Sequence, residues 1–381
     1  EANLVVSSWA VVQRAFYDEN YNGVDWKAVR SEYVKRPYKS MKDARSAVSE
    51  MLSKLGDKYT RYLNPSAYAT LLARFEAKGT DGGIGVVLRE RSAGIVEIVS
   101  VADGSPASSA GLRTADVIAG VGGRKLPKGA TAEDAAALIL GPLDEPLSLS
   151  VTRGAIDSEP LEFALKRQPI SLGECTSQVV QREGSSTIGV LTVPQFSDGQ
   201  PWFDSYSKAL TAIAKADALL IDLRGNPGGH FPTGVAASKL FLPSDTLIVS
   251  TRDRNGVSNP FYTTAAGPYS GDAKPPPLYL LVDRGTASAA EVFAAALSEN
   301  GVATIIGEGG STFGKGLVQT IAKVSDGGAV VCTTARYLTP KGNDLNGVGV
   351  GIDRKVAQPC ARTPAGAVAC LEASGALSAK T

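Results

Sequence analysis

The second half of the chain alternates short, continuous apolar runs with longer stretches of mixed character. Runs with apolar side chains at successive positions are typical of strands that are buried on both faces of a sheet. Four runs fit this description: 188–192, 218–222, 279–282 and 304–306. The stretches between them predict three helices: 205–215, 235–241 and 288–299. This alternation of strands and helices predicts an α/β core.

Two other patterns precede this core. From residue 3 to 76, apolar side chains recur at spacings of three and four, which predicts helices, and no chemical motif accompanies them. The repeating positions are Val5, Trp9, Val12 and Phe16, and then Ala44, Ala47, Met51 and Leu55. After a glycine-rich segment at 77–85, the sequence predicts strands at 86–89, 95–101 and 147–153 and a helix at 132–140.

These patterns divide the chain into four parts. We expect an N-terminal helical domain at 1–78, a β-rich domain at 79–167, an α/β core at 168–356 and a C-terminal tail at 357–381. At roughly 100–200 residues per domain, 381 residues are enough for several domains. The predicted fold class is therefore α/β multidomain.

Composition excludes several classes of protein. Hydrophobic residues make up 43% of the chain, which is enough to form sizeable cores and excludes disorder as the main state. With 39 basic and 38 acidic residues the net charge is +1, so we expect no nucleic-acid partner. The apolar runs are far shorter than the ~18 residues that a spanning helix needs, so we expect no transmembrane segment.

Histidine and cysteine limit the chemistry further. His230 is the only histidine, whereas zinc sites commonly use two or three, so we expect no metal. A hydrolase with a histidine base would have to use His230. Four cysteines are too few for a disulfide scaffold. Cys360 and Cys370 either pair in an oxidising compartment or remain free thiols.

Two motifs follow predicted strands of the core. The first, D-L-R-G-N-P-G-G at 222–229, is a turn whose backbone N–H groups can stabilise an oxyanion, or it is only a structural turn. The second, G-T-A-S-A-A-E at 285–291, places Ser288 at the start of a helix. Ser288 is either a nucleophile there or an ordinary helix cap, with Glu291 completing a capping box.

A third motif, T-F-G-K-G-L-V-Q at 312–319, holds Lys315 between two glycines. A lysine can act as a general base when burial favours its neutral form, although a surface lysine is usually only a solvated charge. In this order, the three motifs resemble those of the carboxyl-terminal processing proteases, which are serine peptidases with a Ser/Lys dyad. The resemblance implies a core of the crotonase and ClpP-like type and an enzyme without a cofactor.

The same resemblance implies roles for individual residues. Ser288 would be the nucleophile, Lys315 the general base and Gln319 a residue that orients the base. Backbone N–H groups of Gly228 and Ala289 would form the oxyanion hole.

The β-rich domain resembles the PDZ domain of this family. The matching segments are Ser105-Pro106-Ala107, Ala110-Gly111-Leu112 and Asp116-Val117-Ile118, with Ala115 at a position that usually holds glycine. A PDZ domain adds the C-terminus of a bound peptide to its sheet as a strand. The segment that resembles the peptide-binding loop consists of Gly83, Ile84, Gly85 and Val86, although ordinary hairpin turns also use such glycines.

Further segments are most similar to the photosynthetic branch of the family. They are F-Y-D at 16–18, N-G-V-D-W at 22–26 and L-G-D-K-Y-T-R-Y-L at 55–63. This similarity implies a protein substrate with a C-terminal extension, the photosystem II reaction-centre precursor, cut at the soluble tail of a membrane protein. It implies the thylakoid lumen of the chloroplast as the location, with the bacterial periplasm as the alternative.

Other interpretations remain open. Ser288 and Lys315 lie 27 residues apart, slightly more than in the family pattern, and the extra length falls at 308–311. A lost dyad would leave a non-catalytic PDZ-type peptide-binding scaffold, but the presence of both residues favours the peptidase. A crotonase-like acyl-CoA enzyme is a second alternative, because it shares the glycine-rich oxyanion turn. His230, next to Gly229, is expected to line the pocket or to be structural rather than catalytic.

Overall fold

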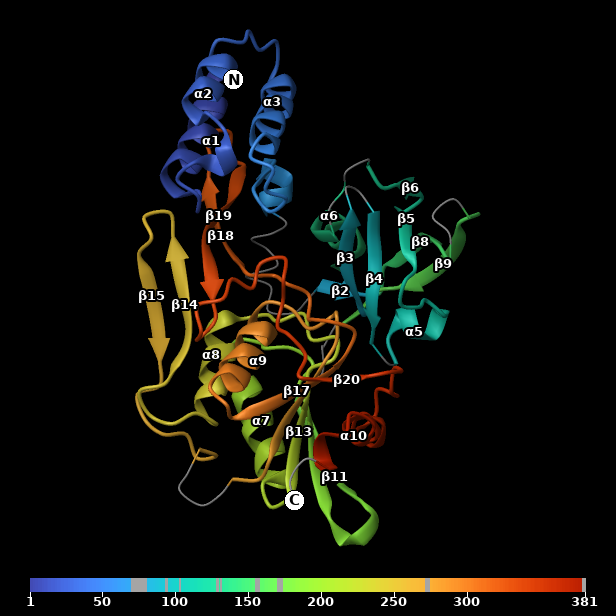
Figure 1. The fold of residues 1–381 in the computed structure, drawn as a ribbon. Coiled ribbons are helices and arrows are strands. Elements are labelled where there is room, and N and C mark those ends of the chain that lie inside the picture. Colours follow the sequence, from blue (N-terminus) through green and yellow to red (C-terminus); the bar gives the residue numbers. More distant parts are fainter. Residues whose placement is uncertain are drawn as a thin grey trace. The chain divides into compact units, whose positions relative to one another are not determined.

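The computed structural model describes residues 1–69, 81–92, 95–102, 104–127, 130, 132–154, 158–169, 174–270 and 275–378. The chain divides into two compact units (Figure 1). The first unit consists of Glu1–Lys78, Ser250–Pro260 and Gly316–Leu338, and the second of Gly79–Val249, Phe261–Lys315 and Thr339–Thr381.

The first unit combines helices with a sheet whose central strand comes from late in the sequence. The helices are α1 (Ala2–Ala15), η1 (a 3-10 turn, Tyr21–Gly23), α2 (Trp26–Val34) and α3 (Met41–Ser53). The strands of this sheet are β1 (Arg61–Leu63), β14 (Leu247–Asp253), β15 (Ser258–Tyr262), β18 (Leu317–Lys323) and β19 (Ala329–Leu338), and the first unit includes β14 from residue 250 and β15 up to residue 260. Strand β19 pairs antiparallel with β1, β14 and β18, so it connects the other strands of this sheet.

The helical prediction for residues 3–76 is confirmed for α1, α2 and α3, whose apolar positions form one core, and is wrong for residues 61–63, which form strand β1 because they pair with β19. Val5, Val12, Ala44, Val48 and Met51 are fully buried there. Val330 and Cys332 of β19 belong to the same core. This explains why the paired strands β18 and β19 belong to the first unit, although the sequence placed them in the predicted core at 168–356. Residues 70–76 of the predicted helical region lie outside the described residues.

Asp57 joins the end of the helical region to β19. Its carboxylate accepts hydrogen bonds from the hydroxyls of Thr60 and Thr333, each at 2.6 Å, and from the backbone N–H groups of Tyr59 and Thr60. The L-G-D-K-Y-T segment is therefore explained by a structural contact within the first unit.

Residues 81–169 of the second unit form the β-rich domain. One sheet has the order β3-β4-β5-β8-β9 with β6 paired to β5, and a small sheet has the order β10-β2-β7. The strands are β2 (Asp81–Gly83), β3 (Val86–Ser92), β4 (Ile95–Val101), β5 (Val117–Val121), β6 (Arg124–Lys125), β7 (Gly141–Pro142), β8 (Pro146–Thr152), β9 (Leu161–Lys166) and β10 (Gln168–Pro169). The helices are α5 (Pro106–Ala110) and α6 (Ala132–Ile139). Ile84, Ile98, Ala107, Ala135 and Leu149 are buried in its core.

The α/β core of the second unit is built on a six-stranded sheet with the order β11-β12-β13-β16-β17-β20. Neighbouring strands run parallel except at the edge strand β11. The strands are β11 (Thr176–Gln181), β12 (Thr187–Thr192), β13 (Ala218–Asp222), β16 (Leu278–Val282), β17 (Ala303–Glu308) and β20 (Arg354–Val356). The helices are η2 (Glu183–Ser185), α7 (Gln200–Ile213), α8 (Phe231–Lys239), α9 (Ala289–Glu299), α10 (Pro364–Ala373) and η3 (Ala376–Ser378). Parallel strands bring the loops after β13 and β16 to the same edge of the sheet.

The residues after Val356 belong to this core, although the sequence suggested a separate tail. In Figure 1, helix α10, drawn in red, lies near β11 and β13. Its buried residues join a cluster of apolar side chains from β12, β13 and β16: Ala367, Val368, Cys370 and Leu371. The sequence pattern gave little sign of this, because an alanine-rich segment shows weak contrast between its apolar and polar faces.

We expect Ala115→Gly to stabilise the PDZ-like domain. Ala115 is exposed and has φ = 71°, in the left-handed region that costs a residue with a side chain about 1–2 kcal/mol. Glycine removes that cost but loses about 0.5–1 kcal/mol more backbone entropy on folding, so the net gain in stability is up to about 1 kcal/mol. Hydrogen exchange of the β4 and β5 amides should slow by up to about fivefold. The same change at Ala137, exposed within α6, should speed exchange, and faster exchange in both variants would contradict the assignment of strain to Ala115.

Candidate active site

Two loops at the carboxyl edge of the sheet are joined by hydrogen bonds. The loop after β13 and the loop after β16 start from paired strands, in which Asp222 lies opposite Leu281. The hydroxyl of Thr286 donates to the carbonyl of Leu223 at 2.8 Å, and the N–H of Ala287 donates to the carbonyl of Asn226 at 2.9 Å. The first two motifs of the sequence are therefore held against each other by one side-chain and one backbone hydrogen bond.

Ser288 lies where the second loop becomes helix α9, in a backbone conformation that few residues with side chains adopt. Its φ is 55° and its ψ is −120°, and it is the residue that precedes the first turn of α9. Strained backbone of this kind clusters at active sites, where the surrounding structure fixes it. A partly buried hydroxyl at a strand–turn–helix junction matches the position expected of a nucleophile.

Gly228 brings the first loop directly against Ser288. Its φ is +94°, and a Cβ at this position would lie 2.8 Å from the Cβ of Ser288, 2.8 Å from the N of Ala289 and 2.6 Å from the O of Ala287. No residue with a side chain fits there without moving backbone. The glycine in this turn is therefore required by the approach of the two loops.

The structure shows two different states for the two expected oxyanion donors. The N–H of Ala289 has no hydrogen-bond acceptor among the described residues and lies at the start of α9, where helix N–H groups favour negative charge. The N–H of Gly228 donates to the side-chain Oδ1 of Asn226 at 2.9 Å. For Gly228 to bind an oxyanion, this bond has to be shared or released, a constraint that the sequence did not indicate.

Glu291 connects Ser288 to Lys315. Its side chain is fully buried, with 0% exposure, and accepts four hydrogen bonds. Oε2 accepts the N–H of Ser288 and the N–H of Lys315, both at 2.8 Å. Oε1 accepts the N–H of Gly314 at 2.6 Å and the hydroxyl of Thr312. The backbones of the two predicted dyad residues are thus bound to the same carboxylate oxygen.

The charge of this carboxylate is under opposing influences. Burial raises the pKa of the Glu291 carboxyl, and the four donated hydrogen bonds oppose that shift because they favour the carboxylate. The sequence predicted Glu291 only as a helix cap and structural support. Its bonds to the third motif arise from a loop 21–24 residues later in the chain, which local sequence spacing does not reveal.

The loop before Lys315 is fixed at several points despite its unusual length. The hydroxyl of Thr312 accepts the N–H of Val350 at 2.8 Å, and the carbonyl of Gly314 accepts the N–H of Gly347 at 2.9 Å. Gly314 has φ = +86°, and a Cβ there would lie 3.1 Å from backbone atoms of Gly347. The additional residues at 308–311 therefore precede a segment that is anchored.

Gln319 and His230 have different surroundings from the residues above. Gln319 lies on β18 of the first unit, at a β-bulge, and its Nε2 is buried with no hydrogen-bond partner among the described residues. The Nδ1 of His230 lies 2.9 Å from the hydroxyl of Thr233, which donates to the carbonyl of Ser197. The same Nδ1 lies 3.3 Å from Oδ1 of Asp198. The carbonyl of His230 accepts the N–H groups of Thr233 and Gly234 at the start of helix α8, which gives His230 a structural role.

The expected peptide-binding loop of the PDZ-like domain is tightly packed. Ile84 is fully buried, and its carbonyl accepts the N–H of Ala107 at 2.9 Å. Gly85 has φ = +78°, and a Cβ there would lie 2.3 Å from the Cβ of Ser105.

Among the described residues, no cluster of three or more metal-binding side chains occurs. No helix in the described part of the chain is long and apolar enough to cross a membrane.

Comparison with known proteins gives the family. Residues 187–356 match the model for peptidase family S41, residues 97–153 match a PDZ domain and residues 7–55 match the tricorn protease C1 domain. The carboxyl-terminal-processing protease of Synechocystis is 35% identical over 362 residues, covering 94% of this chain and 82% of that protein. The chain belongs to peptidase family S41.

Within family S41, further similarities narrow the type of enzyme. The chloroplastic C-terminal processing peptidase of Tetradesmus obliquus is 32% identical, covering 93% of this chain and 76% of that protein. A solved structure described as the photosystem II D1 C-terminal processing protease aligns with a TM-score of 0.84 and 31% identity, covering 97% of this chain and 96% of that chain. The chain is therefore a serine peptidase of the carboxyl-terminal processing type, and the predicted fold class and enzyme class are confirmed.

We expect Glu291→Gln to lower kcat by about 10²-fold or more, because the amide cannot accept all four donors and the loops of Ser288 and Lys315 move apart. The measurement is steady-state cleavage of a tailed protein, with thermal unfolding to confirm that the variant is folded. Glu299→Gln, at the far end of the same helix, should keep kcat close to wild type. A folded Glu291→Gln variant with wild-type kcat would show that the shared carboxylate is not needed.

Proposed function

We propose that Ser288 and Lys315 form the catalytic dyad of this peptidase. The observation that carries the proposal is the Glu291 carboxylate, which binds the backbone N–H of both residues through one oxygen. The strained backbone of Ser288 and the close approach of Gly228 support it. Among the described contacts, none gives His230 a link to Ser288, which favours Lys315 as the base.

In the proposed reaction, neutral Lys315 takes the proton of the Ser288 hydroxyl as the oxygen attacks the scissile carbonyl. The negative oxygen that develops is stabilised by the free N–H of Ala289 and by Gly228, once its bond to Asn226 is shared. Protonation of the leaving amine by Lys315 releases the C-terminal fragment. Water then hydrolyses the acyl-enzyme, with Lys315 again as the base. Gln319 is proposed to orient Lys315, and its unpartnered buried amide supports a polar role.

The proposed substrate is a protein whose C-terminal extension is bound by the PDZ domain around Gly83, Ile84, Gly85 and Val86. The similarity to the D1 processing protease and to chloroplastic and cyanobacterial peptidases supports the photosystem II D1 precursor as that protein. It supports the thylakoid lumen as the location, with a bacterial periplasm as the alternative.

The dyad is tested by mass spectrometry of a soluble protein carrying a C-terminal extension. Wild type should release the extension by cutting one bond. Ser288→Ala and Lys315→Ala should each lose at least about 10³-fold in rate, because the proposed reaction has no other nucleophile and no other base. Ser298→Ala, on the same helix, and Lys323→Ala, on β18, serve as matched controls and should cut normally. Cleavage by all variants alike would refute the dyad, and binding without cleavage by wild type would favour a scaffold.

The substrate is tested by competition between two extensions on one carrier protein. The D1 precursor tail and a scrambled tail of the same composition and length should differ by at least about tenfold in kcat/KM. The variant Gly85→Ala, which forces a Cβ against Ser105, should reduce that preference by raising KM for the D1 tail. Equal rates for the two tails would contradict the proposed substrate while leaving the dyad intact.

A further inference from the structure

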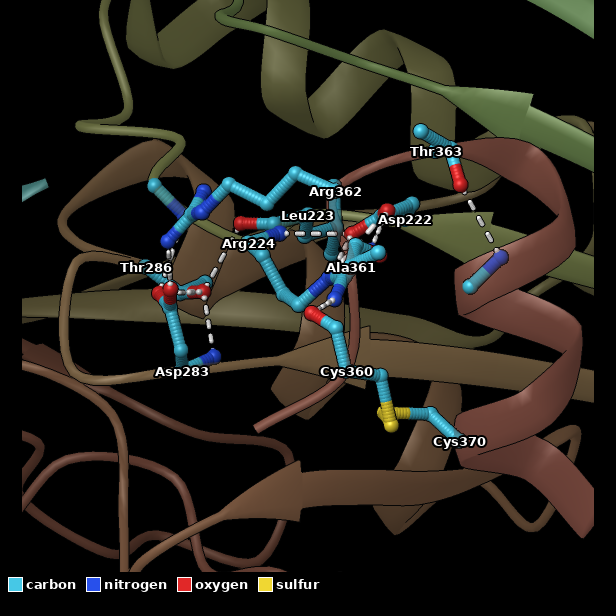
Figure 2. Close-up of polar contacts among 12 residues, drawn as sticks. Asp222, Leu223, Arg224, Asp283, Thr286, Cys360, Ala361, Arg362, Thr363 and Cys370 are labelled. Carbon is cyan, nitrogen blue, oxygen red and sulfur yellow. Dashed lines mark hydrogen bonds and ion pairs between the residues drawn. A yellow bond between two sulfur atoms is a disulfide. The ribbon is translucent and has the colours of Figure 1, made fainter. Parts of the chain in front are cut away.

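A segment after β20 reaches the back of both catalytic loops. We call residues 360–362 the strap. Arg224, in the loop after β13, forms a bidentate ion pair with Asp222, with Nη2–Oδ2 at 2.7 Å and Nε–Oδ1 at 2.9 Å. Its remaining donors reach the strap: Nη1 donates to the carbonyl of Cys360 at 3.0 Å and Nη2 to the carbonyl of Ala361 at 3.2 Å (Figure 2).

The strap also reaches the loop that carries Ser288. Arg362 forms an ion pair with Oδ2 of Asp283. The other carboxylate oxygen of Asp283 accepts the N–H of Gly225 at 2.9 Å and the N–H of Gly285 at 2.8 Å. Asp283 therefore joins the two loops, and Arg362 supplies the positive charge beside it (Figure 2).

Burial makes these contacts consequential. Asp222, Arg224 and Asp283 are each less than 10% exposed. A buried ion or donor that loses its partner carries an uncompensated desolvation cost. If the strap left, Arg224 would lose two hydrogen-bond acceptors and Asp283 would lose its counter-ion. Both loops would then change conformation until these groups found other partners.

The strap is itself fixed to helix α10 at two places. Cys360 forms a disulfide with Cys370, which is fully buried where α10 packs on the sheet. Gly366 of α10 lies against the strap so closely that a Cβ there would be 2.2 Å from the carbonyl of Ala361. The disulfide, seen as the yellow bond in Figure 2, thus connects the strap to an element that the core holds in place.

We propose that Arg362 is a positioning residue for the peptidase reaction and that the Cys360–Cys370 disulfide keeps it in place. A dithiol reductant converts the disulfide into two thiols by supplying two electrons and two protons, and is itself oxidised to a disulfide. The released strap frees the loops of Gly228 and Ser288, so kcat falls while capture of the substrate tail by the PDZ domain is retained. This inference rests on the proposed role of Ser288.

The thiols of the chain permit a clean test of reduction. Cys175 and Cys332 are buried, and burial raises the pKa of each thiol to about 12, which leaves them almost entirely protonated and unreactive. Alkylation after treatment with dithiothreitol should therefore label Cys360, which is partly exposed, and should label the buried Cys370 only in molecules whose strap has left α10. Peptide mass spectrometry then reports how much of the strap has been released in the same sample that is assayed.

The experiment measures kcat and KM separately for the oxidised enzyme, the reduced and alkylated enzyme, Arg362→Ala and Arg362→Lys. Relative to the oxidised enzyme, we expect the reduced and alkylated enzyme and Arg362→Ala each to lose at least tenfold in kcat, with KM within twofold. Arg362→Lys, which keeps the positive charge, should recover part of that kcat. Arg182→Ala is the matched control: it removes the ion pair between Arg182 and Glu372 of α10, which involves neither loop, and should keep kcat.

Two outcomes overturn the inference. One is an unchanged kcat in enzyme whose Cys360 and Cys370 are fully alkylated. The other is an equal loss of kcat in Arg362→Ala and Arg182→Ala, which would indicate general loosening of α10. Neither outcome affects the test of Ser288→Ala, so failure of this inference and failure of the dyad are distinguishable.

Discussion

The site depends on a single buried carboxylate. Glu291 lies in the first turn of α9, and its two oxygens accept one hydrogen bond from Ser288, just before the helix, and three from the distant loop at 312–315. Any one of those donors would be costly to bury without an acceptor. The carboxylate thus makes the strained conformation of Ser288 and the position of the Lys315 loop parts of the same arrangement. The strained backbone conformation of Ser288 persists because the surrounding hydrogen bonds stabilise it by more than the strain costs.

Much of the fold could be predicted from local patterns. Continuous apolar runs identified β12, β13, β16 and β17, because strands buried on both faces need apolar residues at every position. The motif around Ser288 was visible for a similar reason, since small residues and a cap have short-range signatures. The helix α8 began earlier than predicted, at Phe231, because proline in the first turn of a helix is well tolerated.

What could not be predicted are the contacts made between distant segments. Spacing along the chain did not show that Glu291 accepts a hydrogen bond from Lys315 or that Asn226 accepts one from Gly228. It also did not show that side chains of β19 complete the core of the N-terminal helices. Whether Cys360 pairs with Cys370 was open from sequence, and the packing of α10 decides it. Ala115 is the opposite case: its mismatch with the PDZ pattern was visible in the sequence, and its left-handed backbone gives the physical meaning.

Helix α10 has one more consequence. A peptidase that cuts protein tails needs its substrate as an extended, flexible chain that a binding domain can draw out as a strand. Its own residues 360–378 do not offer such a chain, since Ala367, Cys370 and Leu371 are buried and a covalent bond closes the segment into a loop. The packing of α10 on the sheet therefore keeps these residues from being presented as an extended strand.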